Sequence, residues 1–178
     1  DMCLIEYLPE IINSGVSSLK IEGRVKSEYY VATVVKAYRE EIDRYLENPE
    51  KYVFDQSKLE ELCKISHRHY SRGFWHNDCS ENGQIYETSA YIRDYDIVGT
   101  VVKCDPDGNA TIYQRNKFSV GEEIEILRPK GEFLKFTIDS MTNNKGESIQ
   151  SAPHAQMEVN MKLPKYVPEN SMLRRKKN

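Results

Sequence analysis

The densest group of chemically capable side chains lies between Ser66 and Cys79. This stretch holds His67, His69 and His76, three of the four histidines, and the one Trp of the chain. Histidine and cysteine are common zinc ligands, but a His-x-His pair with a Cys twelve positions after the first His fits no compact structural zinc spacing. We therefore expect no metal site here.

The same stretch interleaves basic side chains with aromatic rings. Arginine binds phosphate oxygens, and an aromatic ring gives an unpaired base a surface on which to stack. The residues that we expect to contact a substrate in this way are His67, Arg68, Tyr70 and Phe74. The alternative is that the rings close an ordered connector onto neighbouring elements.

A second group of charged side chains accompanies a short strand pattern over residues 18–23. Apolar Leu19 and Ile21 alternate with charged Lys20 and Glu22, and a glycine ends the alternation. In α/β folds, the turn after a strand lies at the carboxyl edge of the sheet, where ligands bind. The charged residues that we expect to serve a site at this edge are Lys20, Glu22, Arg24 and Lys26.

Glu22 and Arg24 are the candidate catalytic residues of this edge, and Lys20 and Lys26 are candidate substrate contacts. A carboxylate at the end of a barrel strand can act as an acid, a base or a ligand, and an arginine can clamp an anionic substrate. A complete site needs further strands, so we expect chemistry only in a longer barrel and not in this chain alone. The alternative is that Glu22 and Arg24 pair with each other.

Helix patterns lie on both sides of the strand pattern. Ser27 is a typical N-cap, and the apolar residues after it recur at helical spacing to about Leu46. An earlier helix over residues 4–12 contains Pro9, which predicts a kink or a break. A shorter helix is predicted over residues 58–65.

From residue 81 onward, short runs rich in Ile, Val, Thr and Tyr replace the helical spacing. The turn Asp105-Pro106-Asp107-Gly108 predicts an antiparallel hairpin between the first two runs. One face of the strands is apolar and the other polar, as in a small closed barrel. The predicted strands are residues 97–104, 109–114, 123–128, 133–141 and 156–163.

Together these patterns predict an α+β chain in four parts. The helix, strand and helix of the first part need a parallel sheet that the chain itself does not supply. We expect the basic tail to be solvated and frayed, although its cations could touch phosphates. The parts are the end of an α/β region at 1–47, a helical linker rich in His and aromatic residues at 48–83, a small antiparallel β-barrel at 84–165 and a basic tail at 166–178.

The overall charge excludes a strong long-range field for nucleic acid. The 178 residues carry 25 Lys and Arg against 28 Asp and Glu, for a net charge of -3. The four cysteines are widely spaced, which favours reduced thiols over a metal or disulfide framework. No signal peptide or membrane-spanning run is visible, so we expect a cytoplasmic protein.

The first 80 residues resemble the C-terminal part of the collagenase-like proteins of peptidase family U32. The β-rich region matches that family only in outline. The resemblance is carried by residues 1–5 (DMCLI), 18–27 (SLKIEGRVKS) and 29–35 (YYVATVV), and by Ser66-His67-Arg68 with Tyr70, Gly73 and Phe74.

The resemblance implies that residues 18–38 are the last strand and helix of a TIM-like barrel that lies upstream of Asp1. It also implies that the iron-sulfur cluster of related members would belong to that upstream part, because this chain lacks the clustered cysteines. We expect no cofactor in the chain itself. The family carries a peptidase description, whereas some of its relatives take part in hydroxylating tRNA uridines.

We therefore expect an accessory part that helps an upstream catalytic barrel to hold a macromolecular substrate, either a collagen-like protein or tRNA. No nucleophile and base are readable in the chain, so we expect it to have no peptidase activity alone. Two alternatives stay open. One is part of a tRNA uridine hydroxylation protein whose β-barrel contacts tRNA, and the other is a structural domain that forms homo-oligomers.

Overall fold

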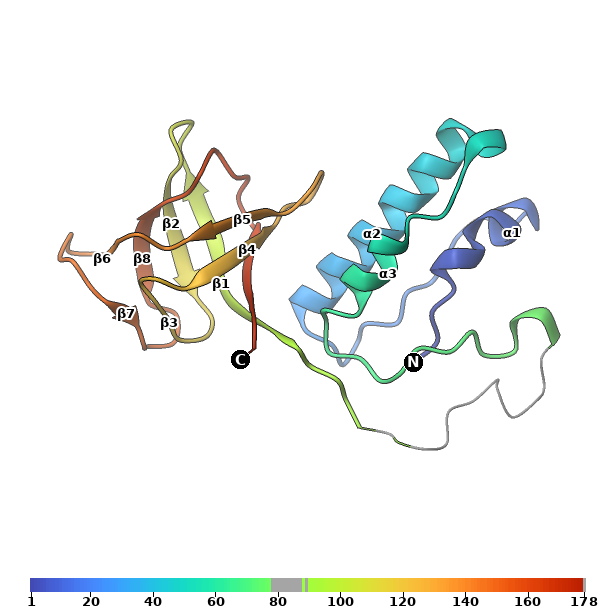
Figure 1. Cartoon of the computed structure of the whole chain (residues 1–178), viewed down its shortest axis with the longest axis horizontal. Helices are drawn as coiled ribbons and strands as arrows, with labels where there is room; N and C mark the ends of the chain where they lie inside the picture. Colours follow the sequence, from blue (N-terminus) through green and yellow to red (C-terminus); the bar gives the residue numbers. More distant parts are fainter. Residues whose placement is uncertain (78–87, 89, 178) are drawn as a thin grey trace. The chain divides into compact units, whose positions relative to one another are not determined.

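The structure is a computed structural model that describes residues 1–77, 88 and 90–177. These residues form two compact units, Asp1–Asp94 and Tyr95–Asn178 (Figure 1). The first unit is helical and the second is a curled antiparallel sheet, so the chain is α+β as predicted. The predicted boundary between residues 83 and 84 lies outside the described residues.

The first unit is built from helices. Pro9 lies in the first turn of α1, so the predicted break separates η1 from α1. The Ser27 hydroxyl accepts a hydrogen bond from the Tyr30 backbone N at 3.2 Å and caps α2 as predicted. None of the helices in the described part of the chain combines the length and the apolar character that crossing a membrane requires. The helices are η1 (Ile5–Tyr7), α1 (Leu8–Asn13), α2 (Glu28–Glu47), η2 (Pro49–Lys51), α3 (Gln56–Leu62) and η3 (Trp75–Asn77).

Helix α2 is the central element of this unit and contacts both α1 and α3. The fully buried Glu41 carboxylate accepts hydrogen bonds from Tyr52 Oη at 2.7 Å and from Arg44 Nη1 at 2.5 Å. It therefore ties α2 to the segment between η2 and α3. The buried apolar side chains of the unit are Ile5, Leu8, Ile11, Tyr29, Val34, Ala37, Tyr45, Leu62 and Ile65.

Residues 18–23 do not form the predicted strand. They carry no regular secondary structure, no strand pairs with them in the described part of the chain, and Leu19 is 39% exposed. A strand forms only where a second backbone supplies the hydrogen bonds of a ladder. The alternation of Leu19 and Ile21 is therefore present without the sheet that it predicts.

The second unit is an antiparallel sheet in the order β5-β4-β9-β1-β2-β8-β6, beside a small sheet of β3 and β7 (Figure 1). The β1–β2 hairpin forms as predicted, and the Asn109 backbone N donates to Asp105 Oδ1 at 2.8 Å across its turn. The strands are β1 (Tyr95–Cys104), β2 (Asn109–Gln114), β3 (Phe118–Ser119), β4 (Glu123–Leu127), β5 (Leu134–Thr137), β6 (Met141–Asn143), β7 (Ser151–Ala152), β8 (Glu158–Lys162) and β9 (Met172–Lys176).

The sheet curls as expected of a small barrel, but it makes a half-barrel. β5 and β6 lie at the two ends of the strand order, so they do not close the barrel by pairing with each other. The single strand predicted over residues 133–141 is split, because Ile138 exchanges backbone hydrogen bonds with Gly121 and Glu122 instead. β5 then stays with β4, whereas β6 joins β8.

The basic run that we expected to fray belongs to the sheet. β9 lies between β4 and β1 and pairs with both of them. Leu173 enters the core, and the neighbouring Arg174 is fully buried. The expectation of a solvated terminus was wrong. The four consecutive cations suggested an exposed tail, but Leu173 directly before them packs into the core and fixes the segment as a strand.

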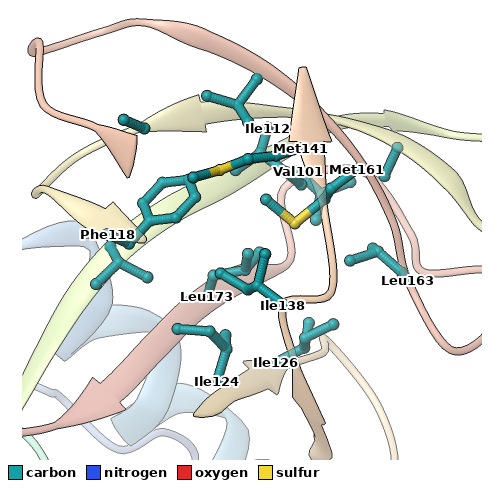
Figure 2. Close-up of a cluster of buried hydrophobic side chains, with 14 of the residues drawn as sticks. Val101, Ile112, Phe118, Ile124, Ile126, Ile138, Met141, Met161, Leu163 and Leu173 are labelled. Carbon is teal, nitrogen blue, oxygen red and sulfur yellow. The ribbon is translucent and has the colours of Figure 1, made fainter. Parts of the chain in front are cut away.

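The core of the β domain lies inside the curl of the sheet. Figure 2 shows Phe118, Met141 and Ile112 in one cluster with Ile124 and Ile126, which lie on β4. Burying each large apolar side chain contributes about 1.5 to 3 kcal/mol. The core residues are Val98, Val101, Ala110, Ile112, Phe118, Ile124, Ile126, Ile138, Met141, Ala152, Val159, Met161, Leu163, Val167 and Leu173.

Candidate functional site

Two of the predicted substrate contacts, Lys26 and Arg68, meet at the carboxylate of Asp1. Arg68 Nε donates to Asp1 Oδ1 at 3.0 Å, and Lys26 Nζ lies 3.7 Å from Asp1 Oδ2. Lys26 Nζ also lies 4.5 Å from the ring centroid of Tyr91 and 5.1 Å from that of Tyr30, which are cation–π distances. These five residues are called the Asp1 cluster below.

The Asp1 cluster already contains an anion for its cations. The Lys26 side chain is 15% exposed and the Arg68 side chain is 47% exposed, so only Arg68 is open to a ligand from solvent. An external phosphate would have to compete with the Asp1 carboxylate for both cations. The clearest physical effect of the cluster is to tie distant parts of the first unit together.

His67 and Tyr70 are part of the same unit but are packed inside it. His67 is 4% exposed, and its ring stacks on that of Tyr70 with 4.5 Å between centroids. His67 Nδ1 lies 2.8 Å from the Arg68 carbonyl oxygen and so donates to it, while Nε2 is buried and has no hydrogen-bond partner among the residues that the structure describes. Tyr70 Oη donates to the Leu62 carbonyl at 2.8 Å, and burial raises the pKa of Tyr70.

The rings after Tyr70 differ in their contacts, since Trp75 and His76 contact α1. Phe74 is 59% exposed. Trp75 Nε1 and His76 Nε2 lie 3.3 Å and 2.7 Å from the Glu10 carboxylate, and the His76 ring packs edge-on against Tyr7. The connector therefore closes onto α1, as one of the two sequence interpretations expects, and leaves Phe74 in solvent.

Lys20, Glu22 and Arg24 are exposed. Glu22 Oε1 accepts a hydrogen bond from the Arg24 backbone N at 2.8 Å, which closes a local turn. Within the part of the chain that the structure describes, no hydrogen bond or ion pair joins these three side chains to the Asp1 cluster. The structure thus unites Lys26 and Arg68 but does not bring Glu22 and Arg24 to them.

Metal ligands are not gathered in residues 1–77, 88 and 90–177. No three His, Cys, Asp or Glu side chains of this described part are placed to hold one ion. Cys79, which completes the His67, His69 and His76 combination considered from the sequence, lies outside it.

The β domain contains a buried ion pair that the sequence did not reveal. Arg174 Nε and Nη2 donate to Glu125 Oε2 at 3.0 Å and 2.8 Å, and Lys135 Nζ lies 3.3 Å from Glu125 Oε1. The guanidinium carbon lies 5.5 Å from the ring centroid of Tyr95 and 5.4 Å from that of Phe133. Aromatic rings therefore flank the buried arginine, and these cation–π contacts offset part of the free energy that its desolvation costs.

A groove of about 830 Å³ lies over this ion pair. Its cations face carboxylates, as in the pairs of Arg175 with Glu122 and of Lys177 with Asp96. Positive and negative side chains balance, so the groove does not attract anions by charge alone. Its lining residues are Tyr95, Asp96, Gly121, Glu122, Glu123, Glu125, Lys135, Arg175, Lys176 and Lys177.

A second groove, of about 650 Å³, crosses β1, β2, β8 and β6 and is lined mainly by uncharged polar side chains. Sequence reasoning missed it, although the alternation within β2 and β8 could have shown that Thr111 and Asn160 point away from the core. The alternation does not show which residues of the neighbouring strands lie next to Thr111 and Asn160, because that depends on the register between the strands.

Comparison with known proteins covers both units. The model of peptidase family U32 matches residues 1–85, and that of the peptidase family U32 C-terminal domain matches residues 93–174. The C-terminal domain of a Geobacillus thermoleovorans protein assigned to the U32 peptidases is 31% identical, with a TM-score of 0.44; the match covers 47% of this chain and 93% of that one.

Two curated relatives match almost the whole chain. The Bacillus subtilis tRNA hydroxylation protein P1 is 38% identical over 99% of this chain, and the Escherichia coli tRNA hydroxylation protein P is 34% identical over 97% of it. The chain spans 42% and 38% of the length of these two relatives.

Proposed function

This chain belongs to peptidase family U32, and we propose that it is the accessory, substrate-holding part of a U32 protein that takes part in tRNA hydroxylation. The observation that carries the proposal is the match of nearly the whole chain to two proteins named for tRNA hydroxylation. Both units take part in that match, so the proposal concerns their combination and not the β domain alone.

The accessory role rests on what the candidate catalytic residues contact. Glu22 accepts a hydrogen bond from the Arg24 backbone and closes a turn, and in the described residues neither side chain forms a hydrogen bond or ion pair with a second acid, base or nucleophile. A reaction needs such partners within hydrogen-bond reach. We infer that the chemistry, and the iron-sulfur cluster implied by the family resemblance, belong to another part of a longer protein.

An apolar groove in the first unit gives that longer protein a place to pack. The groove measures about 420 Å³, and Val16, Val35 and Leu46 beside it are 51%, 47% and 57% exposed. Apolar side chains gathered in one exposed patch favour a protein interface. We propose that an upstream catalytic barrel covers this groove and residues 18–23, which would supply the missing sheet.

Charge distribution supports assigning tRNA contacts to the β domain. Residues 95–178 carry 13 Lys and Arg against 11 Asp and Glu, whereas residues 1–94 carry 12 against 17. Phosphates are repelled by the acidic first unit and are tolerated by the β domain. The excess of two cations is small, so specific contacts must supply most of the affinity.

A chimera tests the proposal. The segment of the Escherichia coli relative that matches this chain is replaced by residues 1–178, in a strain in which deletion of the relative's gene has lowered tRNA hydroxylation. We expect mass spectrometry of tRNA nucleosides to show that the chimera restores hydroxylation, while the relative without this segment does not.

The same chimera separates the peptidase and structural alternatives. Cleavage of gelatin by the purified chimera, without restored hydroxylation, would support the peptidase function instead. A folded chimera that neither hydroxylates tRNA nor cleaves gelatin, and whose oligomeric state changes when the segment is removed, would support a structural domain.

A further inference from the structure

A row of polar side chains crosses the outer face of the β domain in register. Thr111 on β2 lies opposite Lys103 on β1 and opposite Asn160 on β8, and Asn160 lies opposite Thr142 on β6. All four line the 650 Å³ groove. Directly opposed residues have their Cβ atoms about 5 Å apart, so this row forms a continuous set of hydrogen-bonding groups across four strands.

The middle of the row is held in place by its own hydrogen bonds. Thr111 is only 9% exposed although its neighbours Ala110 and Ile112 are the ones that enter the core. Its hydroxyl donates to Asn160 Oδ1 at 2.8 Å, and Asn160 Nδ2 lies 3.4 Å from the Asn143 carbonyl oxygen. The amide oxygen is thereby engaged, while Nδ2 keeps a second hydrogen for a ligand.

One exposed cation, Lys103, stands at the end of the row. Lys103 has no ion pair within the described residues. The nearby Asp105 carboxylate is engaged by Asn109, whose backbone N and Nδ2 donate to it at 2.8 Å and 2.7 Å. Hydrogen bonds from Asn109 lower the pKa of Asp105 and hold it in the turn. The groove thus combines the Lys103 ammonium and the Asp105 carboxylate with neutral donors and acceptors, so a phosphate must be recognised by hydrogen bonds as well as by the single cation.

We propose that this groove binds one unpaired ribonucleotide of the tRNA, with its phosphate at Lys103 and its base edge or ribose hydroxyls at Asn160 and Thr142. The volume lies in the range of small-ligand sites, about 300 to 1,000 Å³, and it is far too small for a duplex. Unpaired bases present the edges that an amide and a hydroxyl read, and the ribose 2′-hydroxyl distinguishes RNA from DNA. The proposal rests on the proposed function, since it names the part of tRNA that the β domain holds.

Binding of short labelled oligonucleotides to the whole chain tests the site. Fluorescence anisotropy is measured with a single-stranded RNA tetranucleotide, with DNA of the same sequence and with a short RNA duplex. We expect the single-stranded RNA to bind more tightly than the other two. Comparable binding of DNA, or no binding of RNA, would overturn the proposal.

Three variants assign the contacts. Asn160→Leu removes the amide at similar volume and should weaken RNA binding about tenfold. Lys103→Ala should weaken binding and reduce the salt dependence, lowering the slope of log K against log salt by about 0.7. Lys130→Ala, which removes an exposed cation outside both grooves, is the matched control and should leave binding unchanged.

Thr111→Val keeps the shape of the side chain but removes the hydroxyl that orients Asn160. It should weaken RNA binding less than Asn160→Leu does, and it serves as the decisive variant if Asn160→Leu does not fold. Equal RNA binding by the parent chain, Lys103→Ala and Thr111→Val would overturn the groove assignment.

The outcomes for the groove and for the proposed function are distinguishable. If the chimera hydroxylates tRNA and the groove variants of the chimera do so equally well, the groove assignment is wrong and the function stands. If the groove variants lose RNA binding but the chimera does not hydroxylate tRNA, the groove binds RNA in a protein of another function.

Discussion

Removing the carboxylate of Glu125 should destabilise the β domain severely. Arg174 is fully buried, and its Nε and Nη2 donate hydrogen bonds of 3.0 Å and 2.8 Å to Glu125 Oε2. In Glu125→Ala the guanidinium loses its counter-ion but cannot reach water. Breaking a buried pair from one side in this way costs about 3 to 5 kcal/mol, because a desolvated charge is left uncompensated.

The third member of this arrangement adds little to that figure. The Lys135 side chain is 55% exposed, so solvent screens its attraction to Glu125 and the pair adds little to stability. Glu123→Ala is the matched control, since Glu123 is an exposed carboxylate on the same strand. We expect it to change the free energy of unfolding by less than about 0.5 kcal/mol.

Urea unfolding followed by circular dichroism measures the effect. With an m-value of about 1 to 3 kcal/mol per M, a loss of 3 to 5 kcal/mol lowers the midpoint by roughly 2 M. The fluorescence of Trp75, the one Trp in the sequence, reports the first unit in the same samples. The double variant Glu125→Leu with Arg174→Met removes both charges, so it should recover most of the lost stability.

Two results would refute this reasoning. A loss of less than about 1 kcal/mol in Glu125→Ala would mean that water reaches Arg174 or that the flanking rings of Tyr95 and Phe133 compensate the charge. A double variant as unstable as the single one would mean that packing, not the stranded charge, accounts for the effect.

Three further predictions concern local contacts. The hydrogen bond from His76 lowers the pKa of Glu10, so His76→Ala should raise that pKa toward its ordinary value of 4.5 in an NMR titration, while the smaller effect of the Trp75 hydrogen bond remains. The contact stabilises the fold above pH 4.5, and this stabilisation is lost as pH falls through the lowered pKa. An unchanged Glu10 titration would contradict the contact. Gly108 has φ +90°, and an added Cβ would lie 2.6 Å from the Leu163 carbonyl oxygen, whereas Gly121 has φ +86° and open space around it. Gly121→Ala should therefore lower the free energy of unfolding by roughly 1 to 2 kcal/mol, and thermal unfolding should show a larger loss of stability for Gly108→Ala. Ser27→Ala removes the N-cap of α2 and should cost about 1 kcal/mol in urea unfolding, with Ser17→Ala, an exposed serine outside the helices, as the unaffected control.

Local chemistry made some elements predictable from the sequence. The N-cap at Ser27 and the spacing after it identified α2, because a helix satisfies its hydrogen bonds within its own segment. The turn Asp105 to Gly108 identified the β1–β2 hairpin, because a turn is also determined by residues that are close together in the sequence. Residues 18–23 show the limit of the approach, since a strand pattern predicts a sheet only if a neighbour exists.

The sites depended on contacts that lie far apart in the sequence. Arg68 meets a carboxylate 67 positions away, and Arg174 meets one 49 positions away, so neither partner was predictable from spacing. The row of Lys103, Thr111, Asn160 and Thr142 exists only through the register of four strands, since a slip of one residue would turn each side chain to the other face.

The central place of β9 has a consequence for synthesis on the ribosome. β9 follows every other strand in the sequence, yet both β1 and β4 need it as a neighbour. At about 5 to 20 residues per second, β1 waits several seconds for β9 to be made, with an unpaired edge exposed meanwhile. The sheet can therefore assemble only after β9 has been synthesised, and until then the edges of β1 and β4 must be kept from pairing with other chains.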